Sequence, residues 1–466
     1  MKSIFVLFSI FLVSTVNAQK KSIEKPSIYF SHGKLVVSDN KRFIIFEDGT
    51  PFFYLGDTAW ELFHRLNKSD AEKYLENRRS KGFTVIQAVV LAELDGLKVP
   101  NANGDLPLFE NDPLKPNEKY FEYVDWVIKK AEGKGLFIGL LPTWGDKVES
   151  KILNINNGYK YGQWIAERYK NYPNIIWING GDRAGKPETI PVWDAIAQGI
   201  KSIDKNHLMS YHPDGRNGSS TSYHNSEWLD FNMRQNGHSA SYTESYLNTK
   251  KDYNLSPAKP VIDGEPIYED IGILFDPIKN GFANAADVRR PLYWNLFSGA
   301  FGHTYGNNAV WQMWTPERTP MFSPFLSWDK AINQPGAEQM QYARWLLESR
   351  PFITRIPDDL IIISDTISTL IPGAGINRFV ATRDITGTYA LIYVPVGRPF
   401  KVNMEVVKSK IVKCWWYNPR NGKADLIGSF SNTGQREFNS PDRGENIDWI
   451  LVIDDASKNY PSPGTR

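Results

Sequence analysis

Eight short apolar runs, separated by segments with helical periodicity, constrain the fold of this chain more than any other feature of its sequence. The runs cover residues 52–56, 84–90, 137–141, 175–178, 208–211, 231–234, 261–263 and 302–305. Most of them are continuous rather than alternating, which is typical of parallel strands buried on both faces. Because strands and helices alternate in eight units, we expect an α/β fold of the (β/α)8 TIM barrel type.

The segments between the runs carry signals for helix starts and helix ends. Ser69 and Glu72 predict a capping box for a helix whose pattern stops at Gly82. Asn117 is expected to cap a second helix, which ends near Gly133. Both segments support the alternation of strand and helix.

The two ends of the chain differ from the barrel region. Lys2, the apolar run 4–13 and the small residues at 16–18 predict a secretory signal peptide, residues 1–18, because the apolar run is too short to span a membrane. We assign residues 19–355 to the barrel, which begins with a β-hairpin near 43–46. Short β-type runs separated by turns predict a small antiparallel β-sandwich over residues 356–466.

Composition excludes several classes of partner and site. The chain has 54 basic and 52 acidic residues and no basic block, so neither nucleic acid nor a membrane surface is an expected partner. The single cysteine, Cys414, excludes an internal disulfide and a cysteine metal site, and secretion without disulfides favours a bacterial periplasm. No H-E-x-x-H pair is present, and we expect no metal and no cofactor.

Carboxylates stand at the carboxyl ends of the fourth and seventh predicted strands, where the active sites of barrel enzymes form. Asp182 follows two glycines, which let backbone approach a substrate closely, and Glu265 directly follows a buried strand. We predict that these two residues are the catalytic pair of a metal-independent glycosidase. Asp182 could instead cap the next helix or pair with Arg183, and Glu265 could form a salt bridge.

The strand ends are also rich in amides, histidines and aromatic rings, which is the chemistry of a carbohydrate cleft. We expect contacts with an oligosaccharide or polysaccharide substrate from Asp57, Trp60, Gln87, Trp144, His212, Gln235, His303, Tyr305 and Trp311. The alternative for these residues is structural, as strand-end packing, capping or core. Glu93 and Asp95 are reserve carboxylates in case Asp182 is not catalytic.

The catalytic hypothesis is a double displacement. Glu265 attacks the anomeric carbon, while Asp182 protonates the leaving oxygen and later deprotonates water. Retention requires carboxyl groups about 5–5.5 Å apart, and inversion requires roughly 6.5–9.5 Å.

Four motifs resemble a known family. Gly56-Asp57-Thr58-Ala59-Trp60, the 116–121 helix start, 177–182 and Asp263-Gly264-Glu265-Pro266 are similar to the apiosidase-like barrels of glycoside hydrolase family 140, and 448–453 resembles the collagen-binding-type sandwich that accompanies them. The resemblance implies cleavage of the bond between apiose and galacturonic acid in rhamnogalacturonan II, a plant pectin. It also implies that Asp182 is the acid/base and Glu265 the nucleophile. Broader barrel glycosidases carry Asn-Glu-Pro at strand 4, so a role for Asn179 as the usual 2-hydroxyl ligand is not expected.

Two other functions stay open. The first is a glycosidase with the same barrel and another sugar, such as a galactoside or an arabinoside. The second is a non-catalytic protein that binds a glycan or another protein. We favour an enzyme, because a binding protein has no need of an acid and a base on opposing strands. The sandwich is expected to support the barrel.

Overall fold

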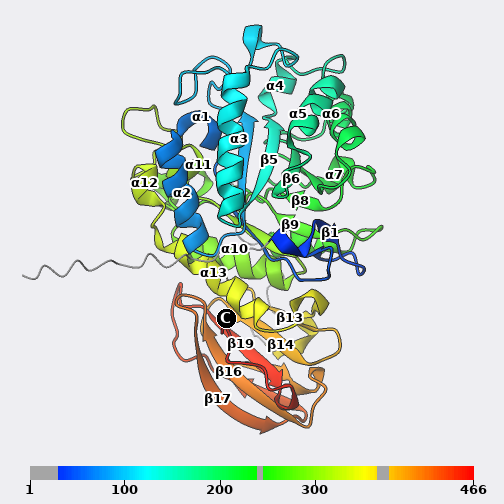
Figure 1. The fold of residues 1–466 in the computed structure, drawn as a ribbon. Coiled ribbons are helices and arrows are strands. Elements are labelled where there is room, and N and C mark those ends of the chain that lie inside the picture. Colours follow the sequence, from blue (N-terminus) through cyan, green and yellow to red (C-terminus); the bar gives the residue numbers. More distant parts are fainter. Residues whose placement is uncertain (1–29, 239–244, 365–376, 466) are drawn as a thin grey trace, which may run out of the picture.

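The computed structural model describes residues 30–238, 245–364 and 377–465, and it places a barrel against a smaller β-sandwich (Figure 1). The predicted signal peptide, residues 1–18, lies outside the described residues. Within the described ranges, no helix combines the length and the apolar character that crossing a membrane requires.

Eight parallel strands form the barrel, as predicted. They are β3 (Tyr54–Thr58), β4 (Val85–Leu91), β5 (Phe137–Thr143), β6 (Ile175–Gly180), β7 (Met209–His212), β8 (Asn232–Arg234), β9 (Val261–Asp263) and β10 (Gly302–Tyr305). The ladder runs in the order β7-β6-β5-β4-β3-β10-β9-β8. Between β7 and β8, the Asp230 N–H donates to the Met209 carbonyl at 2.8 Å and the Ser210 hydroxyl donates to the Phe231 carbonyl at 2.7 Å, which closes the ring.

Helices cover the outside of the barrel (Figure 1). The longer ones are α2 (Lys68–Ser80), α3 (Glu118–Gly133), α5 (Gly158–Tyr169), α6 (Ile190–Ile203), α8 (Ser245–Tyr253), α10 (Ala285–Phe297) and α13 (Pro335–Glu348). Single-turn helices are α1 (Leu62–Arg65), α4 (Asp146–Glu149), α7 (Ser220–Tyr223), α9 (Pro277–Asn280), α11 (Asn308–Trp311) and α12 (Trp328–Ala331). Asn117 caps α3, as predicted. The capping box predicted at Ser69 is wrong, because the Asn67 side chain caps α2 by accepting from the Asp70 N–H.

An amino-terminal hairpin closes the end of the barrel where the strands begin. Its antiparallel strands are β1 (Leu35–Val37) and β2 (Ile44–Phe46). Phe46 of β2 and Phe52, just before β3, both contact Phe137 at the start of β5, with ring centroids 6.3 and 5.2 Å apart. These rings seal the amino ends of the strands, which leaves the opposite end free for a site.

The carboxyl-terminal part is antiparallel, as predicted. A six-stranded sheet contains β11 (Arg355–Pro357), β13 (Val380–Asp384), β14 (Tyr389–Val394), β19 (Trp449–Asp455), β16 (Ile411–Asn418) and β17 (Lys423–Ser431). A three-stranded sheet contains β12 (Ile362–Ser364), β15 (Phe400–Asn403) and β18 (Gln435–Phe438). Cys414 is buried in their shared core, and burial raises the pKa of its thiol to about 12, so this thiol is inert at neutral pH.

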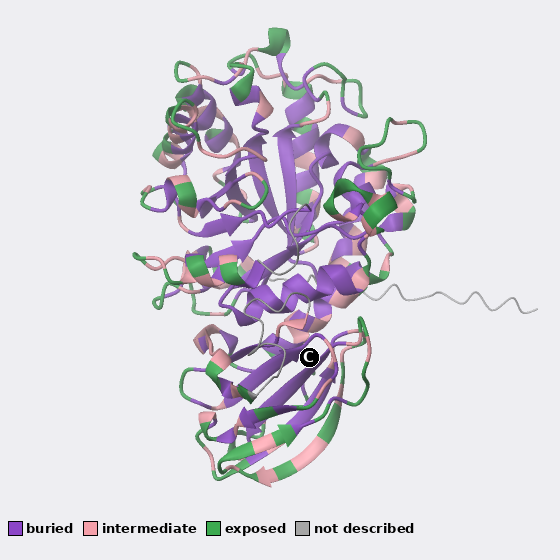
Figure 2. Cartoon of the chain, turned by 180° about the vertical axis from the view of Figure 1, so that it is seen from behind, coloured by how far each residue is buried: buried purple, intermediate pink, exposed green. Residues whose placement is uncertain are grey.

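The barrel and the sandwich share one continuous core, which Figure 2 shows as buried residues running from the strands through α10 and α13 into the sandwich. Tyr293 of α10 stacks on Tyr393 of β14, with ring centroids 5.1 Å apart. Buried ion pairs join Arg289 to Asp448 and Arg350 to Asp454, each with a closest distance of 2.7 Å. The sandwich is therefore packed against the barrel rather than tethered to it.

Candidate active site

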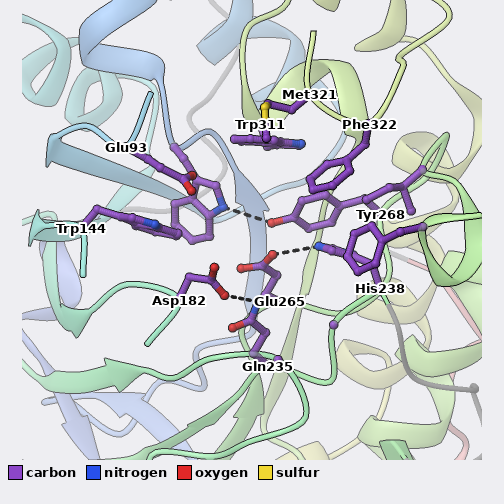
Figure 3. Close-up of a pocket in the computed structure, with 15 residues that line it drawn as sticks. Glu93, Trp144, Asp182, Gln235, His238, Glu265, Tyr268, Trp311, Met321 and Phe322 are labelled. Atoms are coloured by element: carbon purple, nitrogen blue, oxygen red, sulfur yellow. Dashed lines mark hydrogen bonds and ion pairs between the residues drawn. The ribbon is translucent and has the colours of Figure 1, made fainter. Parts of the chain in front are cut away.

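A cavity of about 270 Å³ opens at the carboxyl ends of the barrel strands (Figure 3). It is lined by Trp60, Glu93, Trp144, Asp182, Gly215, Gln235, Gly237, His238, Glu265, Tyr268, Ile271, Phe275, Trp311, Met321 and Phe322. The structure brings both predicted catalytic carboxylates into this one pocket. Asp182 follows β6 and Glu265 follows β9, so they face each other from different strands.

Two histidines hold the Glu265 carboxylate at the bottom of the pocket. Nε2 of His238 lies 3.0 Å from Oε1, and Nε2 of His212 lies 3.0 Å from Oε2. Burial opposes ionisation of Glu265, but its close contacts with His212 and His238 outweigh burial and lower the pKa of this carboxyl to about 2. Glu265 is therefore an oriented carboxylate at neutral pH.

The tautomer of His212 follows from its partners. The backbone N–H of Asp182 donates to Nδ1 of His212 at 3.2 Å, so Nδ1 carries no proton. The ring proton then sits on Nε2, which points at Glu265. His212 thus connects the backbone of one predicted catalytic residue to the carboxylate of the other.

Asp182 projects into the pocket from an unusual backbone. Gly180 and Gly181 have φ of +88° and +125°, and Asp182 itself has φ of +52°. A Cβ on Gly180 would lie 2.4 Å from the carbonyl oxygen of His212, so glycine is required there. Gln235 donates to Oδ1 of Asp182 at 3.1 Å and orients the carboxyl.

The surroundings shift the pKa values of the two carboxyl groups in opposite directions. Burial, and then the charge of Glu265, raise the pKa of Asp182. One group is therefore held ionised while the other is biased towards its protonated form. This division suits a nucleophile or stabilising carboxylate beside a general acid.

Aromatic side chains form the walls of the pocket (Figure 3). Trp60 packs against Trp144 with ring centroids 5.2 Å apart, and its indole N–H donates to the Tyr268 hydroxyl at 3.1 Å. At the mouth, the rings of Phe275 and Phe322 pack against each other with centroids 4.8 Å apart and are 45% and 44% exposed. Rings of this kind stack on the apolar faces of sugars.

The model of the family described as "Apiosidase-like, catalytic domain" matches residues 38–354. The chain belongs to this apiosidase-like family. A second model, described as "Putative collagen-binding domain of a collagenase", matches residues 356–454. A solved structure titled "Glycoside hydrolase" is 37% identical, with a TM-score of 0.88 and coverage of 94% of this chain and 100% of its own.

A glycoside hydrolase family 5 structure from Bacteroides vulgatus is 35% identical, with a TM-score of 0.88 and coverage of 94% of this chain and 97% of its own. A search of the curated proteins returns no match to this sequence. The chain is thus a glycoside hydrolase with an apiosidase-like domain, and carbohydrate is the substrate class that these relatives indicate.

Of the residues predicted to contact substrate, Trp60, Trp144, Gln235 and Trp311 line the pocket of the apiosidase-like barrel. His212 is fully buried behind Glu265, where it positions the Glu265 carboxylate and does not line the pocket. Asp57 is also placed elsewhere than predicted. It is fully buried, accepts from Nε of Arg78 at 2.7 Å and from the Tyr74 hydroxyl, and anchors α2 to the barrel.

Three further predicted contacts lie outside the pocket lining. Gln87 is in the barrel interior, where it accepts from the Tyr54 hydroxyl at 3.1 Å and donates to the Gly264 carbonyl at 2.8 Å. The Tyr305 hydroxyl donates to the buried Glu269 carboxylate at 2.6 Å. His303 is fully buried, and burial lowers its pKa to about 3, so it is a neutral core side chain. Strand-end position suggested these contacts, and none of the three side chains is among the residues that line the pocket.

Several pocket residues were not predicted as substrate contacts. His238, Tyr268, Phe275 and Phe322 line the cavity, and only His238 stands close enough to a predicted strand end to have been found from the sequence. Of the reserve carboxylates, Glu93 lines the cavity, whereas the Asp95 side chain is 68% exposed.

Asn179 is buried, and its amide donates to the carbonyl of Trp193 at 2.9 Å. In the described part of the chain, no three His, Cys, Asp or Glu side chains are grouped so as to hold a metal ion.

Proposed function

We propose that this protein is an apiosidase that cleaves the bond between apiose and galacturonic acid in side chains of rhamnogalacturonan II. The observation that carries the chemistry is the pairing, in one pocket, of a carboxylate held ionised by two histidines with a second carboxyl whose pKa is raised. The match to the apiosidase-like family supports the choice of sugar.

In the proposed reaction, Glu265 attacks the anomeric carbon and forms a covalent glycosyl-enzyme, while Asp182 gives its proton to the leaving oxygen. Asp182 is then a carboxylate and removes a proton from the incoming water, which displaces Glu265 and restores both groups. Gln235 keeps Asp182 oriented in both steps, and His212 and His238 stabilise Glu265 when it leaves as an anion.

The size and walls of the pocket fit this chemistry. A cavity of about 270 Å³ enclosed by Trp60, Trp144 and Trp311 is suited to one sugar residue, and the exposed rings of Phe275 and Phe322 extend the contact surface outwards. The rest of the polysaccharide would lie across this mouth. We also propose that the chain is exported through residues 1–18 and acts in a bacterial periplasm.

The test is product release from rhamnogalacturonan II and from a panel of plant glycans, resolved by mass, with the wild type beside Glu265→Gln. Asp95→Asn is the matched control, because this exposed carboxyl lies outside the pocket. Release of an apiose-terminated oligosaccharide by the wild type and by Asp95→Asn, but not by Glu265→Gln, supports the proposal. Cleavage of other glycans alone would replace apiose with another sugar. If no glycan is cleaved, the result would instead indicate a binding protein.

A further inference from the structure

A third carboxyl group, Glu93, enters the pocket from the loop after β4. Figure 3 shows it on the same side as Trp144, across the cavity from His238 and Tyr268. Burial and neighbouring carboxyl groups are the influences on its carboxyl, and no hydrogen bond to it is found among the described residues. The side chain therefore faces the cavity with its hydrogen-bonding capacity unused.

The backbone on both sides of Glu93 is anchored by buried charged residues. The Ala92 carbonyl accepts from Nζ of Lys147 at 2.7 Å, and the Leu94 N–H donates to Oε1 of Glu61 at 3.0 Å. Lys147 and Glu61 are 3% and 0% exposed. The backbone is thus held on both sides of Glu93, which fixes the point from which its side chain enters the cavity.

We propose that Glu93 binds a hydroxyl of the sugar in the pocket, and that the pocket around it, with an ionised Glu265 and no lining cation, is selective for uncharged sugars. The inference rests on the proposed function, because it assumes that a sugar residue occupies this cavity. It concerns the sugar whose anomeric carbon reacts, and it assigns Glu93 a role in binding rather than in the proton transfers of Asp182.

The charges around Glu93 support this role. Burial raises its pKa to about 8, and the carboxyl groups of Asp182, Glu61, Glu265 and Asp146 raise it further when they are ionised. The nearby cations are already engaged, since Arg183 pairs with Glu149 and Lys147 with Asp146, each at 2.7 Å. Near neutral pH, Glu93 therefore carries a proton that it can donate to a hydroxyl oxygen.

The same surroundings disfavour an acidic sugar. No lysine or arginine is among the residues that line the cavity, and Glu265 beside it is ionised. A uronic acid placed there would bring its carboxylate close to that of Glu265 without a compensating cation. In a bond between a neutral sugar and galacturonic acid, the neutral sugar would occupy the pocket and the galacturonic acid would lie outside it.

Binding of free sugars tests this without relying on hydrolysis, because Trp60, Trp144 and Trp311 line the pocket and report occupancy by fluorescence. D-Galactose and D-galacturonic acid form a matched pair that differs only at C6, and apiose and L-arabinose serve as further neutral probes. Each is titrated into the wild type, Glu93→Gln, Glu93→Ala and the control Asp95→Asn, at pH 6.5 and at pH 9. Circular dichroism checks the fold of every variant.

We expect the wild type to bind at least one neutral sugar, and to bind galactose at least tenfold more tightly than galacturonic acid. Glu93→Ala should weaken neutral-sugar binding at pH 6.5 about fivefold to tenfold, the value of one hydrogen bond. From pH 6.5 to pH 9 the wild type and Asp95→Asn should lose more affinity than Glu93→Gln, whose amide keeps its donor.

Equal affinity for galactose and galacturonic acid, no sugar-dependent signal in the wild type, or the same pH response in Glu93→Gln and wild type would overturn the proposal. The outcome is separable from the proposed function. A protein that binds neutral sugars through Glu93 but does not cleave rhamnogalacturonan II retains the inference about Glu93 and loses only the apiosidase assignment.

Discussion

The ion pair between Arg289 of α10 and Asp448, just before β19, joins the barrel to the sandwich in a fully buried setting. Nε of Arg289 lies 2.8 Å from Oδ2 of Asp448, Nη2 lies 2.7 Å from Oδ1, and both side chains are 3% exposed. The Tyr393 hydroxyl also donates to Oδ2 at 2.9 Å. Asp448 thus accepts from three donors, and no water is needed to satisfy it.

Asp448→Asn keeps the size of the side chain and removes its charge. One oxygen becomes an NH₂ group that faces a donor, and the Arg289 guanidinium stays charged and buried without its anion. Loss of one partner from a buried pair costs about 3–5 kcal/mol. Because the free energy of unfolding of an ordinary protein is only about 5–15 kcal/mol, this loss should be measurable at room temperature.

The measurement is urea unfolding at pH 7, followed by tryptophan fluorescence, for the wild type, Asp448→Asn and the exposed control Asp425→Asn. We expect Asp448→Asn to unfold at a lower urea concentration than the wild type, and the control to unfold at the same concentration as the wild type. The double variant Arg289→Met with Asp448→Leu should recover most of the loss, because neither charge remains buried. A cost below about 1 kcal/mol for Asp448→Asn would refute the reasoning that this pair holds the two parts together.

Three further predictions concern the pocket. Asp182→Asn should lower kcat/KM for a natural glycan about 10²–10⁴-fold, and much less for an aryl glycoside whose leaving group needs no proton, in parallel steady-state assays. Glu265 has a folded pKa of about 2, below its ordinary 4.5, so its stabilising contribution is present above pH 4.5 and is lost as pH falls towards 2. The difference in unfolding free energy between wild type and Glu265→Gln should therefore shrink over that interval, and a constant difference would contradict the assigned pKa. Phe322→Ala should raise KM more than it lowers kcat, because the exposed ring offers binding surface at the mouth.

The barrel could be predicted from sequence because its signals are local. Parallel strands covered on both faces read as continuous apolar runs, and each of the eight runs overlaps one observed strand. The same logic led to Asp182 and Glu265, since residues directly after such strands must gather at one end of the barrel. The special backbone before Asp182 was also predictable, because two consecutive glycines indicate it and their positive φ is a local requirement.

Tertiary structure decided which side chains at that end face the cavity. Asp57 stands at a strand end, yet its carboxylate accepts from Arg78 and Tyr74 of α2. The sequence around Arg78 does not indicate that its partner is a carboxylate on the first barrel strand. His212 was predicted to contact sugar and instead lies behind Glu265, because the direction of a side chain depends on the twist and closure of the barrel.

Sequence by itself thus determined the order of strands and helices, the change to a sandwich and the two carboxylates, all of which depend on residues close together in the chain. Only the tertiary structure decided the pKa difference between Asp182 and Glu265 and the place of Glu93, since burial and the charges that set them come from different strands. Periodicity is a property of a segment, whereas an electrostatic environment is a property of everything that packs around one atom.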